Sequence, residues 1–378
     1  MNTFTKEDLK RFQSEPHDAK IQRSFAKIGE WYSRQKRQCY VSFSGGKDST
    51  VLADLCAQWC KAINEPLQLV FVNTGLEYPE IRHHVEFFAQ WLRDKYGIEV
   101  NLEILRPKMR FDEVIKKYGY PMISKEISKN VYDARKNPKS KAASKFDENS
   151  ECVKKYGSSY SLSKWNPLRE IDIPISHMCC DAMKKKPAKD YERRTGRKPI
   201  IATMAEESRL RTNKWLQFGC NAFDASRQTI NPMSFWTKQD VLQYIKKYDI
   251  PIASVYGSVV YAEDPEQIRI DDFGIECGTE KLKTTGCSRT GCIFCGFGCH
   301  LEKAGEGRFE RLKETHPRQY EYCIGGGEYD ENGKWIPNKK GLGLGHVFDE
   351  LNKIYGEDFI KYKYFYGRKY EKRLDKQL

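Results

Sequence analysis

Short apolar segments alternate with longer amphipathic segments through the first two thirds of the chain. Four segments rich in β-branched and aromatic residues predict strands. They span residues 38–43, 67–72, 100–105 and 199–204. Helical patterns lie between them, at residues 49–60, 79–96 and 111–118. Strands that alternate with helices indicate an α/β fold with a doubly wound, mostly parallel sheet.

The pattern then becomes helical and later rich in cysteine. Residues 237–249 are amphipathic, with Thr237 as N-cap and Asp240 at the reciprocal position of a capping box. Cysteines follow at 277–299, and residues 346–355 predict another helix. We therefore expect three parts. They are a helical N-terminal segment (1–35), an α/β domain (36–275) and a cysteine-rich part with C-terminal helices (276–378).

Residues 125–165 interrupt this alternation. They hold ten Lys or Arg against five Asp or Glu and few large aliphatic residues, which predicts a surface insertion with a loop or short helices. Its basic side chains are typical of a solvated surface or of one that follows a phosphate backbone. They include Lys125, Lys129, Arg135, Lys136, Lys139 and Lys141.

The chain of 378 residues carries 65 Lys and Arg against 52 Asp and Glu, a net charge of +13. Such an excess favours anionic partners, nucleotides and nucleic acid among them. The tail, 361–378, mixes basic with aromatic residues, which is typical of a packed helix or of a grip on single-stranded nucleic acid.

No stretch reaches the roughly 18 apolar residues of a membrane span, and the N-terminal residues lack the apolar core of a signal peptide. We therefore expect a cytoplasmic protein with no membrane partner. Thirteen cysteines in that compartment indicate metal binding or packing and not a disulfide framework.

A glycine-rich hexapeptide joins the first predicted strand to the first predicted helix. Its residues are Ser44, Gly45, Gly46, Lys47, Asp48 and Ser49. Two glycines allow a tight turn with backbone amides facing a ligand, and a helix N-terminus adds roughly half a positive charge there. The spacing differs from a Walker A loop. The hexapeptide therefore predicts a phosphate-binding loop, with Lys47 and Asp48 as candidate catalytic residues.

Ser-Gly-Gly-Lys-Asp-Ser after a strand resembles the pyrophosphate loop (PP-loop) of adenine nucleotide alpha hydrolases. The segment after the second strand, with Thr74 and Gly75, is similar to a segment of the phosphoadenylyl-sulfate reductase family in that superfamily. Asn73 stands where that family usually has Asp. Residues 231–241 are similar to the family's Pro-Leu-x-x-Trp run, with Met233 in place of Leu.

A further segment matches the family's Arg-x-Glu-Ser-x-x-Arg pattern. Glu207, Ser208 and Arg211 match it, whereas Met204 or Ala205 stands where Arg is common. The resemblance implies that these residues, with Thr74, Gly75 and the loop, bind an adenine nucleotide: adenylyl sulfate, phosphoadenylyl sulfate or ATP. A planar guanidinium can hold a phosphate or sulfonate with two hydrogen bonds, which is the physical reason to expect Arg211 there.

Four cysteines fall within thirteen residues near the start of the predicted cysteine-rich part: Cys287, Cys292, Cys295 and Cys299. Thiolates at this spacing are typical ligands of an iron–sulfur cluster, and their first three copy a plant-type ferredoxin spacing. A tetrahedral zinc site is an alternative.

A second cysteine motif implies a different ligand set. Cys179 and Cys180, followed by Lys184 and Pro187, resemble the Cys-Cys-x-x-x-Lys-x-x-Pro segment of adenylyl-sulfate reductases. In that family the pair joins a later Cys-x-x-Cys on a [4Fe–4S] cluster. The resemblance therefore implies that Cys179, Cys180, Cys292 and Cys295 hold the cluster. The four neighbouring cysteines at 287–299 remain the alternative set.

Sulfonucleotide reductases attack sulfur with a cysteine of a Glu-Cys-Gly motif near the C-terminus, because a thiolate is the nucleophile this chemistry needs. Residues 359–378 contain no cysteine. Two candidates remain for a catalytic thiol: Cys277, within a Glu-Cys-Gly sequence, and Cys323.

Three functions fit these features. The first is reduction of adenylyl or phosphoadenylyl sulfate by a thiol reductant, which the Cys-Cys pair favours. The second is cleavage of ATP to AMP and pyrophosphate, with sulfur from a donor protein passed into nucleic acid, as in DNA phosphorothioation or tRNA thiolation. The basic insertion and the cysteine-free tail favour the second. The third is a non-catalytic nucleotide or nucleic-acid binding module with a structural metal site.

Overall fold

The computed structural model describes residues 4–222, 227–262 and 281–363. The chain folds into two compact units, each assembled from separate stretches of sequence. The first unit holds residues 1–73, 77–106 and 187–290, and the second holds 74–76, 107–186 and 291–378. This differs from the expected division, because 107–186 groups with the cysteine-rich part and not with the α/β domain.

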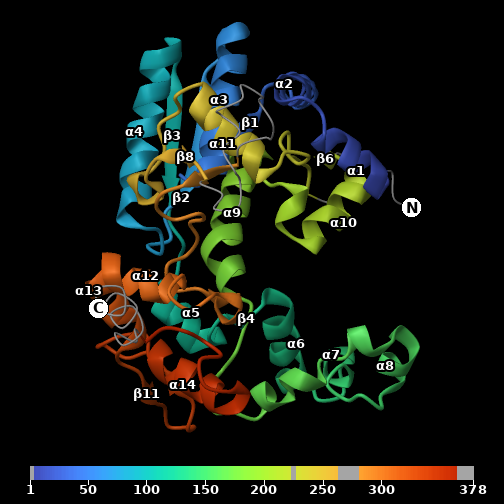
Figure 1. The fold of residues 1–378 in the computed structure, drawn as a ribbon, viewed down its shortest axis with the longest axis vertical. Coiled ribbons are helices and arrows are strands. Elements are labelled where there is room, and N and C mark those ends of the chain that lie inside the picture. Colours follow the sequence, from blue (N-terminus) through green and yellow to red (C-terminus); the bar gives the residue numbers. More distant parts are fainter. Residues whose placement is uncertain (1–3, 223–226, 263–280, 364–378) are drawn as a thin grey trace, which may run out of the picture. The chain divides into compact units, whose positions relative to one another are not determined.

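The first unit is built on a six-stranded sheet (Figure 1). Its strand order is β3-β2-β1-β5-β7-β6. The strands are β1 (Cys39–Ser42), β2 (Leu67–Val72), β3 (Val100–Leu105), β5 (Lys198–Ile200), β6 (Asn221–Ala222) and β7 (Thr229–Ile230). All neighbours are parallel except β6, which is antiparallel to β7. The expected α/β fold with a mostly parallel sheet is confirmed.

Strand β1 lies where the order of the sheet reverses. From β1 the chain proceeds to β2 and β3 on one side, and it returns later to β5 on the other. Val41 of β1 is thus paired with Leu69 and with Ile200. Ligands of open α/β sheets bind outside the carboxyl ends of the strands at such a reversal, because the flanking connections diverge there. The loop that follows β1 is the predicted phosphate loop.

Helices cover this sheet and bury its apolar side chains. They are α1 (Lys6–Gln13), α2 (His17–Arg34), α3 (Lys47–Ala62), α4 (Pro79–Tyr96), α9 (Lys186–Thr195), α10 (Arg209–Phe218) and α11 (Lys238–Lys247). Val51, Leu52 and Leu55 of α3 are fully buried in the same core as Phe43. The strands predicted at 67–72 and 100–105 and the helix predicted at 79–96 are confirmed residue for residue.

The second unit is mainly helical. Its helices are α5 (Phe111–Tyr118), α6 (Lys125–Lys136), α7 (Lys141–Ser144), α8 (Glu151–Tyr156), α12 (Arg308–Thr315), α13 (Pro317–Ile324) and α14 (Leu344–Tyr355). Strand β4 (Met122–Ile123) pairs in parallel with β10 (Gly296–Phe297), and β11 (Glu328–Tyr329) pairs with β12 (Trp335–Ile336). Among the described residues, no helix is both long and apolar enough to cross a membrane.

The basic insertion is helical because serine caps start its helices. The hydroxyls of Ser124, Ser140 and Ser150 each accept a hydrogen bond from the amide three residues later, which satisfies a donor of the first turn. Arg135 was expected on a solvent-facing surface that could follow phosphates, but it is half-buried. Its guanidinium donates to three backbone carbonyls, those of Leu168, Ile171 and Ile173. Arg135 therefore links α6 to residues 168–173, which follow the insertion.

A buried ion pair joins two helices of the first unit. The Lys20 ammonium on α2 lies 2.8 Å from both carboxylate oxygens of Asp240 on α11, and their side chains are only 4% and 8% exposed. Asp240 also accepts hydrogen bonds from the amide and hydroxyl of Thr237, the N-cap of α11. One carboxylate therefore both starts α11 and fixes it to α2, and the predicted capping box is confirmed.

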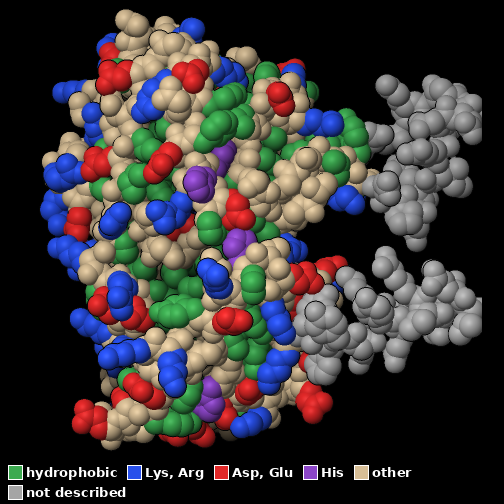
Figure 2. Space-filling view, turned by 90° about the vertical axis from the view of Figure 1, so that its left-hand side faces the viewer, with side chains coloured by type: hydrophobic (Ala, Val, Ile, Leu, Met, Phe, Trp, Pro, Cys, Tyr) green, Lys and Arg blue, Asp and Glu red, His purple; other side chains and the backbone are tan. Residues whose placement is uncertain are grey.

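One face of the molecule carries charges of both signs. On the face drawn in Figure 2, Lys and Arg side chains are dispersed among Asp and Glu side chains. The net positive charge is therefore not gathered into one patch on that face.

We expect Lys20→Met to lower the free energy of unfolding by about 3–5 kcal/mol, because it leaves the Asp240 carboxylate buried without its countercharge. Lys247→Met is the matched control, since Lys247 pairs with Asp18 between the same two helices but at an exposed position. It should leave stability nearly unchanged. Urea unfolding followed by circular dichroism measures both, and equal losses would contradict the argument.

Candidate functional site

The phosphate loop turns sharply between β1 and α3. Gly45 has φ +72°, and a Cβ built on it would lie 2.8 Å from Ile81 Cγ2 and 2.9 Å from Val85 Cγ2 of α4. Both the left-handed backbone and the close approach of α4 require glycine here. Helix α3 then begins at Lys47 with Gly46 as N-cap, so no side chain of the cap residue covers its first amides.

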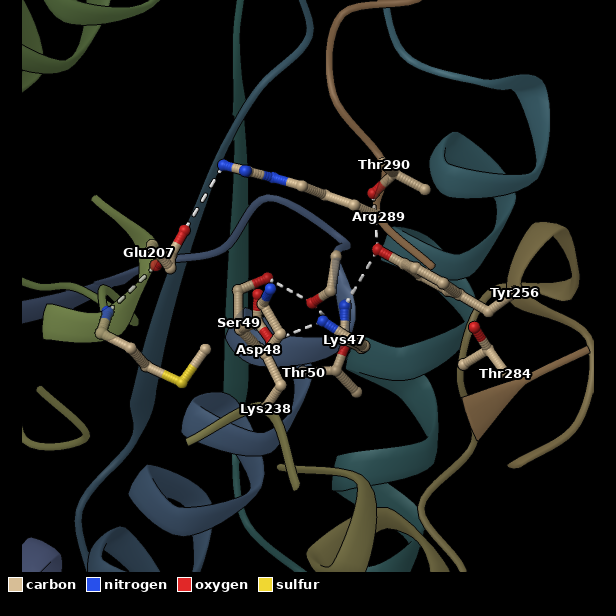
Figure 3. Close-up of polar contacts among 12 residues, drawn as sticks. Lys47, Asp48, Ser49, Thr50, Glu207, Lys238, Tyr256, Thr284, Arg289 and Thr290 are labelled. Atoms are coloured by element: carbon tan, nitrogen blue, oxygen red, sulfur yellow. Dashed lines mark hydrogen bonds and ion pairs between the residues drawn. The ribbon is translucent and has the colours of Figure 1, made fainter. Parts of the chain in front are cut away.

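Hydroxyl groups bind the backbone amides of this loop. The Ser44 amide donates to Ser49 Oγ at 3.2 Å, and the Lys47 amide donates to the Tyr256 hydroxyl at 3.3 Å. The Tyr256 hydroxyl also lies 2.5 Å from Thr290 Oγ1 (Figure 3). Burial raises the pKa of Tyr256 to about 12, so its phenol stays protonated at neutral pH. Amides at a helix N-terminus are the donors that bind phosphate oxygens in other proteins.

Lys47 and Asp48 form an ion pair within the loop. Lys47 Nζ lies 2.9 Å from Asp48 Oδ1, and the Lys47 side chain is only 9% exposed. The ammonium is therefore held beside the amides of α3, where it adds to the positive end of the helix dipole. The hexapeptide thus brings an ammonium group, a carboxylate and the first amides of α3 into one turn.

A carboxylate near the loop orients two arginines. Glu207, whose side chain is 10% exposed, forms ion pairs with Arg211 and with Arg289, the latter at 3.4 Å. Ser208 caps α10 by accepting from the Arg211 amide at 3.3 Å. Figure 3 shows Arg289 extending from the segment of Thr290 toward Glu207, across the loop residues. Glu207 and Ser208 thus position Arg211, and Arg289 joins it as a second guanidinium.

The sequence analysis missed Tyr256, Arg289 and Thr290. They come from segments more than 200 residues after the loop, so only the fold brings them to it. Arg289 and Thr290 stand shortly before Cys292, in a motif that indicates a metal-ligating cysteine and does not connect these two residues with the loop.

A buried histidine supports the loop from behind. His84 Nε2 on α4 lies 3.1 Å from Thr50 Oγ1, and that hydroxyl also donates to the Gly46 carbonyl at 3.2 Å. Burial lowers the pKa of His84 from 6.5 to about 4. The imidazole is therefore neutral at physiological pH.

In the second unit, four cysteines line one cavity. They are Cys179, Cys180, Cys292 and Cys295. The rest of its lining is apolar except for one lysine: Leu76, Phe111, Pro121, Met183 and Lys184. The structure therefore brings together the ligand set that the Cys-Cys motif implied.

The thiols of this cavity differ in environment. Cys179 donates to Cys180 across 3.9 Å, and this contact, with the ammonium groups of Lys125 and Lys184, lowers the pKa of Cys180. Burial raises the pKa of Cys295 to about 12.

Among the described residues, no three His, Cys, Asp or Glu side chains are placed to hold a single metal ion. The four sulfurs surround a volume instead of converging on a point.

The alternative ligand set is less well grouped. Cys287 belongs to the first unit, whereas the other three belong to the second. Cys299 is buried and donates to the Gly296 carbonyl at 3.0 Å. Neither Cys287 nor Cys299 lines the cavity.

The remaining predicted residues fall elsewhere. Cys323 is completely buried, and burial raises its pKa far above the ordinary value, which disfavours it as a nucleophile. Cys277 lies outside the described residues. Thr74 and Gly75 belong to the second unit, where Thr74 Oγ1 accepts from the Leu76 amide at 3.2 Å.

Comparison with known proteins identifies related sequences. A family model described as "Phosphoadenosine phosphosulfate reductase domain" matches residues 38–151 and 125–296, more than half of the chain. Two uncharacterized proteins of Methanocaldococcus jannaschii are also similar. MJ0066 is 37% identical over 94 residues (25% of this chain, 18% of that protein), and MJ0973 is 32% identical over 118 residues (30% and 26%). The chain thus spans about a fifth to a quarter of the length of these relatives.

Among solved structures, the U34-tRNA thiolase NcsA from Methanococcus maripaludis with its [4Fe-4S] cluster is similar to this chain. The likeness has 14% identity and a TM-score of 0.32, over 62% of this chain and 66% of that one.

We expect His84 to make stability pH-dependent. Below pH 6.5 the unfolded chain protonates His84 while the folded chain does not, until pH falls to about 4. Stability should therefore fall by about 1.4 kcal/mol per pH unit across this window from His84 alone. His84→Gln, which does not titrate, should remove that component of the loss between pH 7 and 5. Urea unfolding at both values measures it.

The control for this experiment is His83→Gln, since His83 is the exposed neighbour on the same helix. Its loss on acidification should match that of the unsubstituted chain. An unchanged pH dependence in His84→Gln would contradict the assignment of a neutral, buried imidazole.

Proposed function

Because the chain belongs to the phosphoadenosine phosphosulfate reductase family of the PP-loop superfamily, we propose that it is an iron–sulfur enzyme acting on the sulfur chemistry of an adenine nucleotide. The nucleotide would be adenylyl sulfate, phosphoadenylyl sulfate or ATP, bound on the loop from Ser44 to Ser49. One observation carries the proposal. Four thiols from two distant sequence segments line one cavity, in a chain that also builds a phosphate loop at a sheet reversal.

The loop supplies the phosphate site. A phosphate oxygen would accept the hydrogen bond that the Lys47 amide now donates to the Tyr256 hydroxyl. The Lys47 ammonium would turn from Asp48 to the ligand. Arg211 and Arg289, both oriented by Glu207, would bind the anionic group at the other end of the phosphate chain or the sulfate. Fixed positive groups of this kind stabilise the negative charge that develops on a leaving phosphate.

The cavity fits an iron–sulfur cluster better than a single ion. Zinc holds sulfur at about 2.3 Å, which places its four sulfur ligands about 4 Å apart. Cys179 and Cys180 lie 3.9 Å apart, and among the described residues no three His, Cys, Asp or Glu side chains are grouped to hold a single ion. Cys179, Cys180, Cys292 and Cys295, all in the second unit, would hold a [4Fe–4S] cluster. The apolar lining would exclude water.

Within this class, reduction of adenylyl or phosphoadenylyl sulfate is the first candidate. A thiolate would attack the sulfur and release the adenine nucleotide. A second thiol from a reductant would then free sulfite and leave a disulfide. This route needs an accessible thiolate in addition to the cluster ligands.

Transfer of sulfur to nucleic acid is the second candidate. The complete burial and raised pKa of Cys323 favour it, because they disfavour one of the two candidate attacking thiols. The acceptor oxygen would attack the α-phosphate of ATP and release pyrophosphate, and sulfide-level sulfur from a donor would then displace AMP from the adenylated acceptor.

Product analysis tests these proposals. Cluster-loaded protein is incubated with adenylyl sulfate and a thiol reductant, or with ATP, a sulfur donor and RNA. Formation of sulfite supports reduction, and formation of pyrophosphate supports sulfur transfer. If neither product forms, the chain is a binding module without these activities. The active reaction should be slowed by about 10²–10³ in Lys47→Ala, which removes the charge at the phosphates. Lys61→Ala, an exposed lysine at the other end of α3, should not slow it.

Single cysteine variants test the ligand set. After anaerobic reconstitution with iron and sulfide, Cys180→Ala should lose the brown colour and bound iron, because it removes a ligand. Cys287→Ala and Cys299→Ala should keep both, since neither residue lines the cavity. The opposite pattern would establish the alternative set, and a colourless protein loaded with zinc would contradict the cluster.

A further inference from the structure

Two tyrosines and three lysines of the insertion form a surface group, here named the tyrosine–lysine cluster: Lys141, Lys145, Lys155, Tyr156 and Tyr160. Lys141 and Lys155 each lie 5.6 Å from the centre of the Tyr156 ring, and Lys145 lies 4.5 Å from that of Tyr160. The two rings are 5.1 Å apart and tilted by 44°. Three ammonium groups thus lie over two neighbouring aromatic rings, from which they can turn to a phosphate.

This cluster is accessible and not neutralised. Tyr156 is 52% exposed, and Lys141 and Lys155 are exposed. Within the described parts of the chain, no ion pair joins a carboxylate to any of the three lysines. In contrast, Lys125 of the same insertion pairs with Asp181 at 3.5 Å.

The cluster stands on an ordered frame. Its residues come from α7, the C-cap position of α7 (Lys145), α8 and the 3₁₀ turn Ser158–Tyr160 that follows α8. Ser140 and Ser150 cap the two helices, and the Leu162 amide donates to the Lys145 carbonyl at 2.7 Å. In Figure 1, α7 and α8 lie side by side at one edge of the second unit. The rings and charges are therefore presented together.

We propose that the tyrosine–lysine cluster binds unpaired nucleotides of an RNA. The lysines would contact successive phosphates, and the rings of Tyr156 and Tyr160 would stack on bases. Stacking on an exposed ring requires a base outside a helix, and folded RNA presents such bases in its loops, whereas duplex DNA does not. An acidic protein would use the lysines but would gain nothing specific from the rings.

This inference rests on the sulfur-transfer candidate and extends it. It assigns RNA as the class of acceptor and the tyrosine–lysine cluster as the surface that binds it. Binding itself requires neither ATP nor the reaction. Failure of RNA binding with normal pyrophosphate release would refute the inference alone. RNA binding without any pyrophosphate or sulfite would refute the proposed reactions alone.

The first test uses fluorescence anisotropy of a labelled, unstructured 20-nucleotide RNA with the full, cluster-loaded chain. Tyr156→Leu should weaken binding about 5- to 100-fold, since it removes a stacking face. Tyr156→Phe keeps the ring and should bind like the unsubstituted chain. Equal losses in both variants, or none in either, would overturn the proposal. Tighter binding of single-stranded or duplex DNA of the same sequence would overturn it as well.

The second test measures how affinity depends on salt. The triple variant K141Q/K145Q/K155Q should reduce the slope of log affinity against log salt by about 2, because each phosphate contact contributes about 0.7 for a single strand. The control K10Q/K61Q/K189Q removes the same charge from exposed lysines of the first unit. It should keep the original slope. Equal slopes in the two triple variants would show that only net charge matters and would overturn the site.

Discussion

The turn at Gly45 is the constraint on which the phosphate site depends. Strand β1 points its carboxyl end at the reversal of the sheet, and the chain must turn at once into α3 for the first amides of that helix to face the same point. Helix α4 packs so closely on this turn that its Ile81 and Val85 leave no room for a Cβ. The position of Lys47, the exposure of its amide to Tyr256 and the support from Thr50 and His84 all follow from that turn.

The chain assigns its two kinds of chemistry to two units. The first unit holds the loop that we propose binds phosphate, and the second holds four thiols around an apolar cavity. Both units are discontinuous, so the chain passes between them several times. One passage separates Thr290, which contacts Tyr256 in the first unit, from Cys292, which lines the cavity in the second. A single short segment therefore carries residues for both sites.

Sequence patterns located much of the fold because its central elements have strong local signals. Strand β2 is a continuous apolar run, and α4 begins at Pro79 and ends before Gly97, which has φ +61°. The helices of 125–165 were hard to predict, because they have too few apolar residues to show a helical period. Without that period, their serine caps cannot be told from serines of a loop. The two-unit division was missed because it depends on contacts between distant segments. For the same reason Cys179, Cys180, Cys292 and Cys295 could be grouped only by resemblance, and Tyr256 not at all.

The hydroxyl of Tyr256 on the Lys47 amide also bears on selectivity. Any ligand of that amide must exchange with a hydrogen bond that already exists, so only the difference between the two bonds contributes to affinity. A charged phosphate oxygen accepts a hydrogen bond roughly twice as strong as a neutral hydroxyl does. A nucleoside without phosphate offers merely another neutral oxygen. If the loop binds phosphate as proposed, it would therefore select ligands by their charge, because only a charged oxygen gains from replacing the Tyr256 hydroxyl.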